Sequence, residues 1–375
     1  MHNKTKTLSK KQNYTKLISS IGNILETGRK KAIQSVNQIL VKTYWNIGKQ
    51  IIEFEQQGKE KAEYGGALLD KLSKDLRLKY GKGFSKSNVY LMRQFYLRYK
   101  KFQTVSGKLS WSHYAELLSI EENIARNFYE TQCSQENWSV RELKRHIQSA
   151  LFHRVALSRD KKGVLELSKK GQVVLSARDI IKDSYVLEFL NIPEDYTYSE
   201  KELEQKIIDN LQLFLLELGK GFTFVKRQYR MTLDNNHYYV DIVFYHRILK
   251  CFVLIDLKIG KVTHQDIGQM NMYLNYFKKE ENTNQEAEPI GIILSAEKDH
   301  ILVEYALGGI SNKLFVSKYK LYLPDKKELQ EKLKAFKEQA LLSKKLAILR
   351  IDTPVDIELA DVEIKNLFDK EKALI

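Results

Sequence analysis

Two strand-forming segments lie close together in the chain, and the short stretch between them dictates how they pair. Residues 238–245 and 251–258 are rich in β-branched and aromatic residues, which favour β-strands. If residues 247–250 form the loop of a hairpin, the pairing register places Asp241 opposite Asp256. Side chains in that position lie ~4.5–5.5 Å apart at Cβ, and like charges there repel. Such a pair is readily retained when a cation lies between the carboxylates.

Lys258 adds a basic side chain to the two carboxylates and indicates what chemistry they could perform. It follows Asp256 by two residues and projects to the same side of the strand. One Asp facing an Asp-x-Lys is the outline of a metal-dependent nuclease centre, because carboxylates bind Mg²⁺ (or Mn²⁺), which activates water and shields a phosphate. Lys258 would orient that water or stabilise the developing charge. The alternative is a structural ion pair.

Two further polar residues are predicted to join this centre. Glu204 lies on a predicted helix over residues 199–218, on the same face as Ile208 and Leu211. A carboxylate on a core-facing stripe is costly unless a metal, its water or Lys258 pairs with it. The alternative is that Glu204 extends to solvent. Gln269, on the helix after Lys258, could contact the water or substrate. The predicted catalytic residues are Asp241, Asp256, Lys258, Glu204 and Gln269, and the predicted metal ligands are Asp241, Asp256 and Glu204.

Charge and composition narrow the class of partner. The formal net charge is +15 and the pI is near 9.3, which favours a polyanion, either nucleic acid or an anionic membrane surface. A general richness in lysine is the alternative explanation. Only Cys133 and Cys251 are present, so neither a disulfide framework nor a zinc site is indicated. No signal-peptide-like stretch and no run of 18 apolar residues is present, so we expect a cytoplasmic protein with no membrane span.

The pattern of apolar residues changes along the chain. With 375 residues there is room for two or three domains. Residues 14–158 show helical spacing throughout, and residues 159–198 are interpreted as a linker or transition. From residue 199 the order is α-β-β-β-α-β-α-β-α, with a helix expected at 300–307 and the last helix beginning at residue 326, which indicates a mixed sheet with helices outside. The nuclease-like domain is predicted over residues 199–325. Residues 326–375 are predicted to form a charged helical tail.

The helical region contains a candidate nucleic-acid-binding motif. Residues 64–79 and 85–99 are predicted to form two helices joined by a Gly-containing turn, the outline of a helix-turn-helix. Between Asp70 and Lys101 there are ten Lys or Arg residues and two Asp residues, which suits contacts with phosphates. The alternative is the solvated face of an ordinary helical bundle. The predicted nucleic-acid-binding residues are Lys82, Lys86, Ser87, Asn88, Arg93 and Arg98, of which 86–88 could reach base edges.

Several short motifs together resemble a known family. They occupy residues 83–88, 109–114, 214–222, 227–230, 240–246, 255–258 and 268–274. This string is similar to the YhcG-like PD-(D/E)XK nucleases over residues 17 to 333. The resemblance implies an αβββαβ restriction-endonuclease-like core, an N-terminal domain that binds DNA, and catalytic positions at the five residues predicted above. Val240 stands where the superfamily motif has Pro, and this departure removes no ligand.

The sequence therefore predicts a Mg²⁺-dependent DNA endonuclease with an N-terminal DNA-binding domain. One alternative is a catalytically inactive nucleic-acid-binding or assembly protein that uses the nuclease fold for docking. Another is a structural protein that self-associates through its charged tail. A homodimer is compatible with the first interpretation, because cutting both strands benefits from two centres. Nucleic acid, DNA in preference to RNA, is the expected partner.

Overall fold

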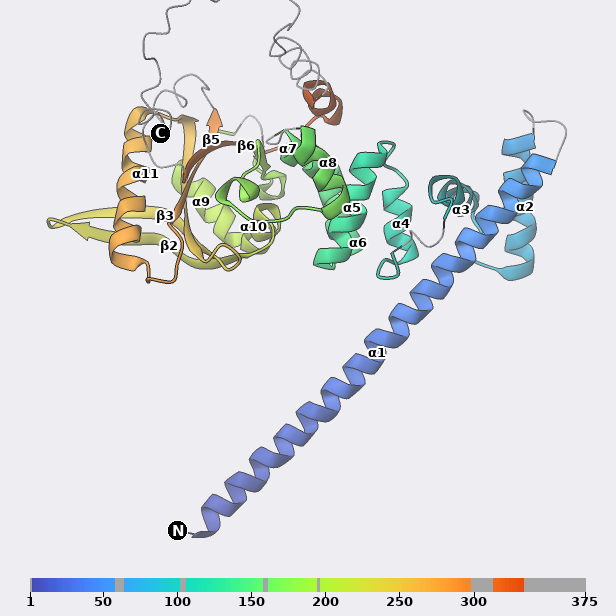
Figure 1. Cartoon of the computed structure of the whole chain (residues 1–375), viewed down its shortest axis with the longest axis horizontal. Helices are drawn as coiled ribbons and strands as arrows, with labels where there is room; N and C mark the ends of the chain where they lie inside the picture. The colour runs from blue at the N-terminus through green and yellow to red at the C-terminus, as the bar shows by residue number, and fades with distance from the viewer. Residues whose placement is uncertain are drawn as a thin grey trace, which may run out of the picture. The chain divides into compact units, whose positions relative to one another are not determined.

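The computed structural model describes residues 2–57, 64–101, 106–157, 161–193, 196–297 and 313–333 (Figure 1). Contacts divide the chain into two units, Met1–Gln330 and Glu331–Ile375. The helix predicted at 300–307 and the tail beyond residue 333 lie outside the described residues, whereas residues 326–333 are helical. In the described part, no helix is long and apolar enough to span a membrane.

The first half of the described chain is built from helices, as the spacing of its apolar residues predicts. These are α1 (His2–Gln57), α2 (Tyr64–Tyr80), α3 (Lys86–Arg98), α4 (Trp111–Leu117), α5 (Asn123–Glu136), α6 (Val140–Gln148), α7 (Leu151–Ala156) and α8 (Lys161–Lys170).

The predicted helix pair corresponds to α2 and α3. The turn between them contains Gly81 and Gly83, both at positive φ, where glycine carries no steric cost. Ser85 accepts a hydrogen bond from the backbone N–H of Asn88 at 3.2 Å and so caps the N-terminus of α3. Val89 of α3 packs with Ile51 of α1 and Leu69 of α2.

The second half is organised around a mixed sheet with the strand order β1-β6-β5-β4-β3-β2. The order confirms the predicted mixed sheet, because β2, β3 and β4 pair antiparallel whereas β4, β5, β6 and β1 pair parallel. The strands are β1 (Ser184–Val186), β2 (Phe222–Leu233), β3 (Asn236–His246), β4 (Cys251–Lys261), β5 (Ile290–Glu297) and β6 (Leu314–Lys320).

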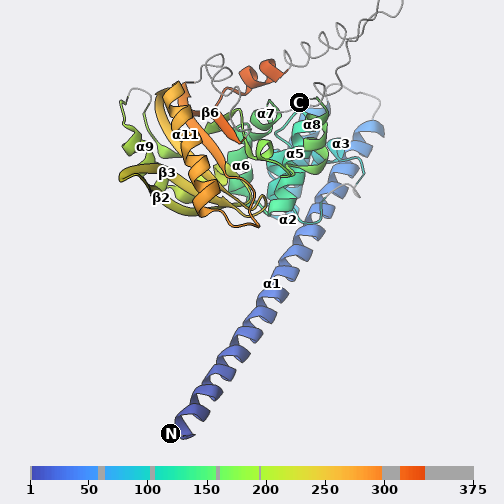
Figure 2. The same ribbon diagram turned by 60° about the vertical axis from the view of Figure 1, so that its left-hand side comes forward.

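Helices cover both faces of this sheet. On one face, α9 (Glu200–Asp209) and α10 (Leu211–Leu218) pack Leu203 and Phe214 against Phe244 of β3 and its neighbours. On the other, α11 (His264–Tyr276) buries Ile267 and Tyr273 against β4 and β5 (Figure 2). Since both faces are covered, residues 251–257 of β4 and 290–295 of β5 are largely buried, which explains the nearly continuous apolar sequence of these stretches.

Two predicted boundaries differ from the structure. The single helix expected over residues 199–218 is interrupted at Asn210, whose side-chain amide donates to the carbonyl of Lys206 at 3.0 Å and competes with the helical pattern. The predicted end at residue 218 is confirmed, because α10 ends at Leu218 and Gly219 follows as its C-cap with φ of 105°. Residues 159–198, interpreted as a linker or transition, contain α8 and β1, which joins the sheet beside β6. The strand β1 has only three residues, which is too short to show the alternation of apolar and polar residues that identifies a strand in a sequence.

Candidate active site

The β3–β4 hairpin brings Asp241 and Asp256 together in the predicted register. Ladder pairs run from His246–Cys251 to Ile242–Ile255, so Asp241 and Asp256 occupy the next positions. Asp256 is 5% exposed, and Asp241 is half-buried. Two carboxyl groups therefore share a poorly solvated corner where β3 and β4 leave the core of the sheet.

Hydrogen bonds fix the orientation of Asp241. Its Oδ2 accepts from the backbone N–H of Leu257 at 2.8 Å, and its Oδ1 accepts from the Gln228 amide at 3.1 Å. Burial raises the pKa of Asp241, the Leu257 N–H opposes this, and the nearby Glu204 raises the pKa further. Asp241 is thus held in place while its negative charge is poorly solvated.

Lys258 lies where the Asp-x-Lys spacing predicts, beside Asp256. Its Nζ is 3.0 Å from Asp256 Oδ2, 3.6 Å from Asp266 Oδ1 and 3.8 Å from Glu200 Oε2. Burial would lower the pKa of Lys258, but these carboxylates more than offset it, so its pKa lies above the usual value and the amine is charged.

The negative charge of Asp256 remains unfavourable despite its ion pair with Lys258. Its pKa is raised to about 7, chiefly by burial and further by repulsion from Asp241, although Lys258 opposes the rise. One lysine therefore does not balance the two opposed carboxylates. A further cation between them would relieve the repulsion.

Glu204 approaches this corner from α9 and is 3% exposed, so the alternative that it extends to solvent is wrong. Its Oε1 accepts from Arg227 Nε at 3.1 Å and its Oε2 from Gln228 Nε2 at 2.7 Å. The side chain predicted to face the metal is therefore joined to Asp241 through the amide of Gln228.

Gln228 is a member of the site that the sequence reasoning missed. It lies opposite Asp241 in the β2–β3 ladder, between the pairs Arg227–Ile242 and Tyr229–Val240. Its φ of 45° is in the left-handed region, which is costly for a residue with a side chain. The strained backbone coincides with a side chain that donates to both Glu204 and Asp241. The one sequence signal for Gln228 is its place in the motif at residues 227–230, and that motif does not indicate what the side chain contacts.

Gln269 lies on α11 and bonds within that helix. Its amide donates to the hydroxyl of the buried Tyr273, one turn along. Burial raises the pKa of Tyr273, and the hydrogen bond from Gln269 opposes this rise. The negative charges of Asp256 and Asp241 raise the pKa of Tyr273 further. The predicted Gln269 is therefore coupled to the carboxylate corner through Tyr273.

The oxygen-rich donor set fits a hard divalent cation better than a soft metal. Asp241 and Asp256 supply adjacent carboxylates whose pKa values are raised by burial and by repulsion from neighbouring carboxylates. In the described part of the chain, no three His, Cys, Asp or Glu side chains are grouped closely enough to hold a metal. The amide of Gln228 intervenes between Glu204 and Asp241. The Asp pair thus fits a cation as it stands, whereas Glu204 joins it only if Gln228 moves.

The predicted nucleic-acid-binding residues divide into two groups. Lys82 and Ser87 are exposed, and Lys86 is exposed while paired with Asp70 at 2.8 Å. The others make internal contacts that favour a structural role: Asn88 bonds Gly83 and Trp111, Arg93 bonds Glu55, and Arg98 bonds the carbonyl of Ile120.

Comparison with known proteins covers both halves of the chain. The family model described as YhcG PDDEXK nuclease domain matches residues 178–334, and the DUF1016 N-terminal domain matches residues 20–154. The first match begins ahead of the boundary predicted at residue 199 and takes in β1. The chain is 39% identical over 352 residues to the Escherichia coli (strain K12) protein named "Putative nuclease YhcG", covering 85% of this chain and 93% of that protein.

Solved structures show a weaker likeness. A repair endonuclease from Pyrococcus abyssi is 22% identical with a TM-score of 0.25, over 35% of this chain and 50% of that one. An EndoMS–dsDNA complex is 19% identical with a TM-score of 0.24, over 36% and 51% respectively. The matched region spans about half of each of those chains.

Proposed function

Because the chain belongs to the YhcG family of PDDEXK nucleases, we propose that it is a divalent-metal-dependent DNA endonuclease with its centre at Asp241, Asp256 and Lys258. The observation that carries this proposal is the opposed carboxylate pair, with Asp256 buried and Asp241 half-buried, and a charged lysine at 3.0 Å from Asp256. A structural ion pair gives no reason for the second carboxylate, which raises the pKa of Asp256.

Each side chain has a distinct part in the proposed mechanism. Asp241 and Asp256 would hold Mg²⁺ or Mn²⁺, with Glu204 as a third carboxylate once Gln228 is displaced. When bound, such an ion polarises the scissile phosphate and lowers the pKa of water. Lys258 donates to a phosphate oxygen and stabilises the negative charge that develops there. The Leu257 N–H keeps the Asp241 carboxylate oriented throughout.

Covalently closed plasmid DNA tests the proposal directly, because it has no ends from which an exonuclease could start. We expect the full-length protein to nick the plasmid with Mg²⁺ or Mn²⁺, to stop when EDTA removes the metal, and to resume when the metal is restored. Gel analysis of supercoiled and open circles measures the rate.

Circular single-stranded DNA and circular RNA of matched length serve as comparison substrates. Preference for RNA would contradict the DNA assignment. Tight DNA binding without cleavage under any divalent metal would favour the inactive binding or assembly protein, which the retained carboxylates argue against.

The helical region is proposed to position DNA through the turn before α3. Lys82→Ala combined with Lys86→Ala removes two exposed cations, and losing the surface pair Lys86–Asp70 should cost little stability. If both lysines contact phosphates, DNA affinity falls for all sequences, and the slope of log affinity against log salt flattens by about 1.8. Fluorescence anisotropy over a salt series measures both.

A matched double variant of α8, Lys169→Ala with Lys170→Ala, removes the same charge from another exposed surface. It should bind DNA with a nearly unchanged salt slope. Equal flattening in both variants would mean that only the net charge matters and would contradict a phosphate-contact role for the turn.

A further inference from the structure

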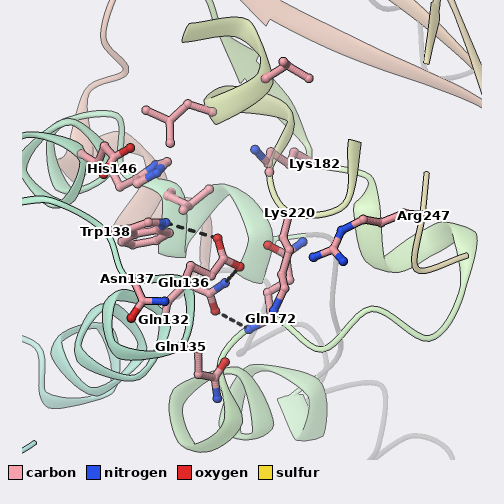
Figure 3. A pocket seen from close by; sticks show the side chains of 15 residues that line it. Gln132, Gln135, Glu136, Asn137, Trp138, His146, Gln172, Lys182, Lys220 and Arg247 are labelled. Carbon is pink, nitrogen blue, oxygen red and sulfur yellow. Dashed lines mark hydrogen bonds between the residues drawn. The ribbon is translucent and has the colours of Figure 1, made fainter. Parts of the chain in front are cut away.

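A cavity of about 480 Å³ lies among the C-terminal end of α5, α6, the C-terminal end of α10 and the β3–β4 turn (Figure 3). It is separate from the carboxylate pair, because Arg247 on its lining follows Asp241 by six residues, roughly 20 Å along an extended strand. Its volume falls within the range of small-molecule sites in proteins.

One side of the cavity is cationic. Lys220 and Arg247 are exposed and lie near each other in Figure 3, and neither side chain has an ion pair or hydrogen bond within the described residues. Lys182 also lines the cavity but is committed to Glu217, with its Nζ 3.7 Å from Glu217 Oε1. Lys220 and Arg247 are therefore available to an anion, and a guanidinium matches the geometry of a phosphate.

The lining contributed by α5 offers hydrogen-bond acceptors, and the charge of Lys220 stabilises the Glu136 carboxylate there. The Glu136 carboxylate accepts from the Gln132 amide and from Trp138 Nε1, the latter at 3.2 Å. Gln132 Oε1 in turn accepts from the backbone N–H of Gln172 at 2.7 Å, which fixes this arrangement (Figure 3). A carboxylate has about four acceptor positions, so Glu136 can still accept from a ligand.

A buried histidine lies at the cavity with its hydrogen bonds unmade. His146 is 2% exposed, and neither ring nitrogen has a partner within the described residues. Burial lowers its pKa to about 3, so the ring is neutral, with one donor and one acceptor nitrogen. Buried polar side chains are seldom left unpaired in native proteins. The unmet donor and acceptor are an independent sign that this cavity accepts a polar molecule.

We propose that this cavity binds a nucleoside phosphate, with the phosphate at Lys220 and Arg247 and the amino-bearing edge of the base at Glu136. A ligand with an anion at one end and hydrogen-bond donors at the other matches the two unlike sides. Carboxylates are suited to exocyclic amino groups of bases, as guanidinium groups are to phosphates. The ligand would bridge α5 to the β3–β4 turn and so join the helical half to the nuclease domain. This inference does not depend on the proposed catalytic function.

Thermal unfolding of the full-length protein tests the proposal. The probes are AMP, GMP, CMP and UMP at about 1 mM in EDTA, so that no metal bridges a nucleotide to Asp241 and Asp256. We expect at least one nucleotide to raise the melting temperature by about 2–5 °C, since a ligand that binds only the folded state stabilises it. Inorganic phosphate and the unphosphorylated nucleosides should each produce a smaller shift.

Variants locate the binding. Lys220→Ala with Arg247→Ala should abolish the shift, whereas Arg141→Ala with Lys144→Ala, an exposed α6 pair outside the cavity lining, should retain it. Asp256→Asn should also retain it. The proposal would be overturned if no probe shifted the melting temperature, or if the cavity double variant and the α6 double variant showed equal shifts.

Two further measurements define the ligand. Glu136→Gln should reduce the shift most for nucleotides with an exocyclic amino group, and an equal reduction for UMP would count against the assigned orientation. The same phosphate and base could belong to a free nucleotide or to the end of a nucleic-acid strand, and a 5′-phosphorylated oligonucleotide distinguishes the two. A shift from the oligonucleotide that the cavity double variant loses would support the strand end.

Discussion

Replacing Asp256 with Asn is expected to slow metal-dependent plasmid nicking by on the order of 10³-fold. Asparagine has nearly the same shape, but its neutral amide replaces an anionic oxygen beside Asp241 and removes the charge paired with Lys258 at 3.0 Å. Because the proposed centre relies on two adjacent carboxylates, neutralising one should weaken metal binding as well as the chemical step. Initial rates across a Mn²⁺ titration separate these two effects.

The same variant should not be less stable than the wild-type protein at pH 8 without metal. Burial and Asp241 raise the pKa of Asp256 to about 7 in the fold, above its value of about 3.9 in an unfolded chain. A carboxyl group shifted upward contributes stability that is fully present below pH 4 and is lost as pH rises through 7. The ionised group therefore opposes folding at pH 8, and Asn removes that cost. Melting temperatures in EDTA at pH 5 and pH 8 measure the difference.

Asp183→Asn provides a matched control, because Asp183 is exposed just before β1 and outside the carboxylate corner. It should nick DNA at the wild-type rate. An Asp256→Asn protein that nicks at full rate would show that the catalytic centre lies elsewhere. A protein that is inactive and also melts much lower at pH 8 would show that Asp256 acts chiefly in folding.

The pairing of Asp241 with Asp256 could be predicted from the sequence because it depends on local rules. A four-residue turn and the alternation along β3 and β4 fix the register, and the register alone brings the two carboxylates together. Lys258 follows from the same alternation. These three residues are close in the chain, so no knowledge of the rest of the fold was needed.

Contacts between distant segments could not be predicted in this way. Arg93 resembles a free cation in the sequence, but its partner Glu55 lies 38 residues earlier on α1. Gln228 reaches Glu204 and Asp241 only because its backbone adopts a left-handed conformation within a strand, which no propensity favours. The surrounding structure must stabilise that conformation, and the sequence does not show how.

Glu217 is the other position at which one substitution should have a large effect, here on stability. Its carboxylate is fully buried and bonds Arg154 Nη1 at 2.5 Å, with Arg145 at 3.4 Å and Lys182 at 3.7 Å. Arg145 and Arg154 belong to α6 and α7, whereas Glu217 belongs to α10, so this cluster connects the helical half to the nuclease domain. The sequence shows only a glutamate in a leucine-rich helix.

Glu217→Gln is expected to lower the free energy of unfolding by about 3–5 kcal/mol, because Arg154 and Lys182 would stay buried without their main counter-charge. Urea-induced unfolding followed by circular dichroism measures this. The matched control is Glu188→Gln, which also loses a bond to Arg145 but lies at the more exposed end of the cluster. Its cost should be about 1 kcal/mol or less.

The pH dependence separates this electrostatic explanation from a simple packing defect. Burial alone would raise the pKa of Glu217, but Arg154, Lys182 and Arg145 lower it below its usual range. Its stabilising contribution is therefore fully present above the unfolded pKa of about 4.3 and decreases as pH falls further. The deficit of Glu217→Gln should shrink in acid. It should also shrink as pH rises toward 8, because losing Glu217 lowers the pKa of Lys182 below its wild-type value of about 8, so the amine becomes neutral in the variant while it is still charged in the wild-type protein. Above pH 8 the amine is neutral in both folded proteins, and the deficit should stay constant. A deficit independent of pH would instead mean that Glu217 stabilises the fold by shape rather than charge.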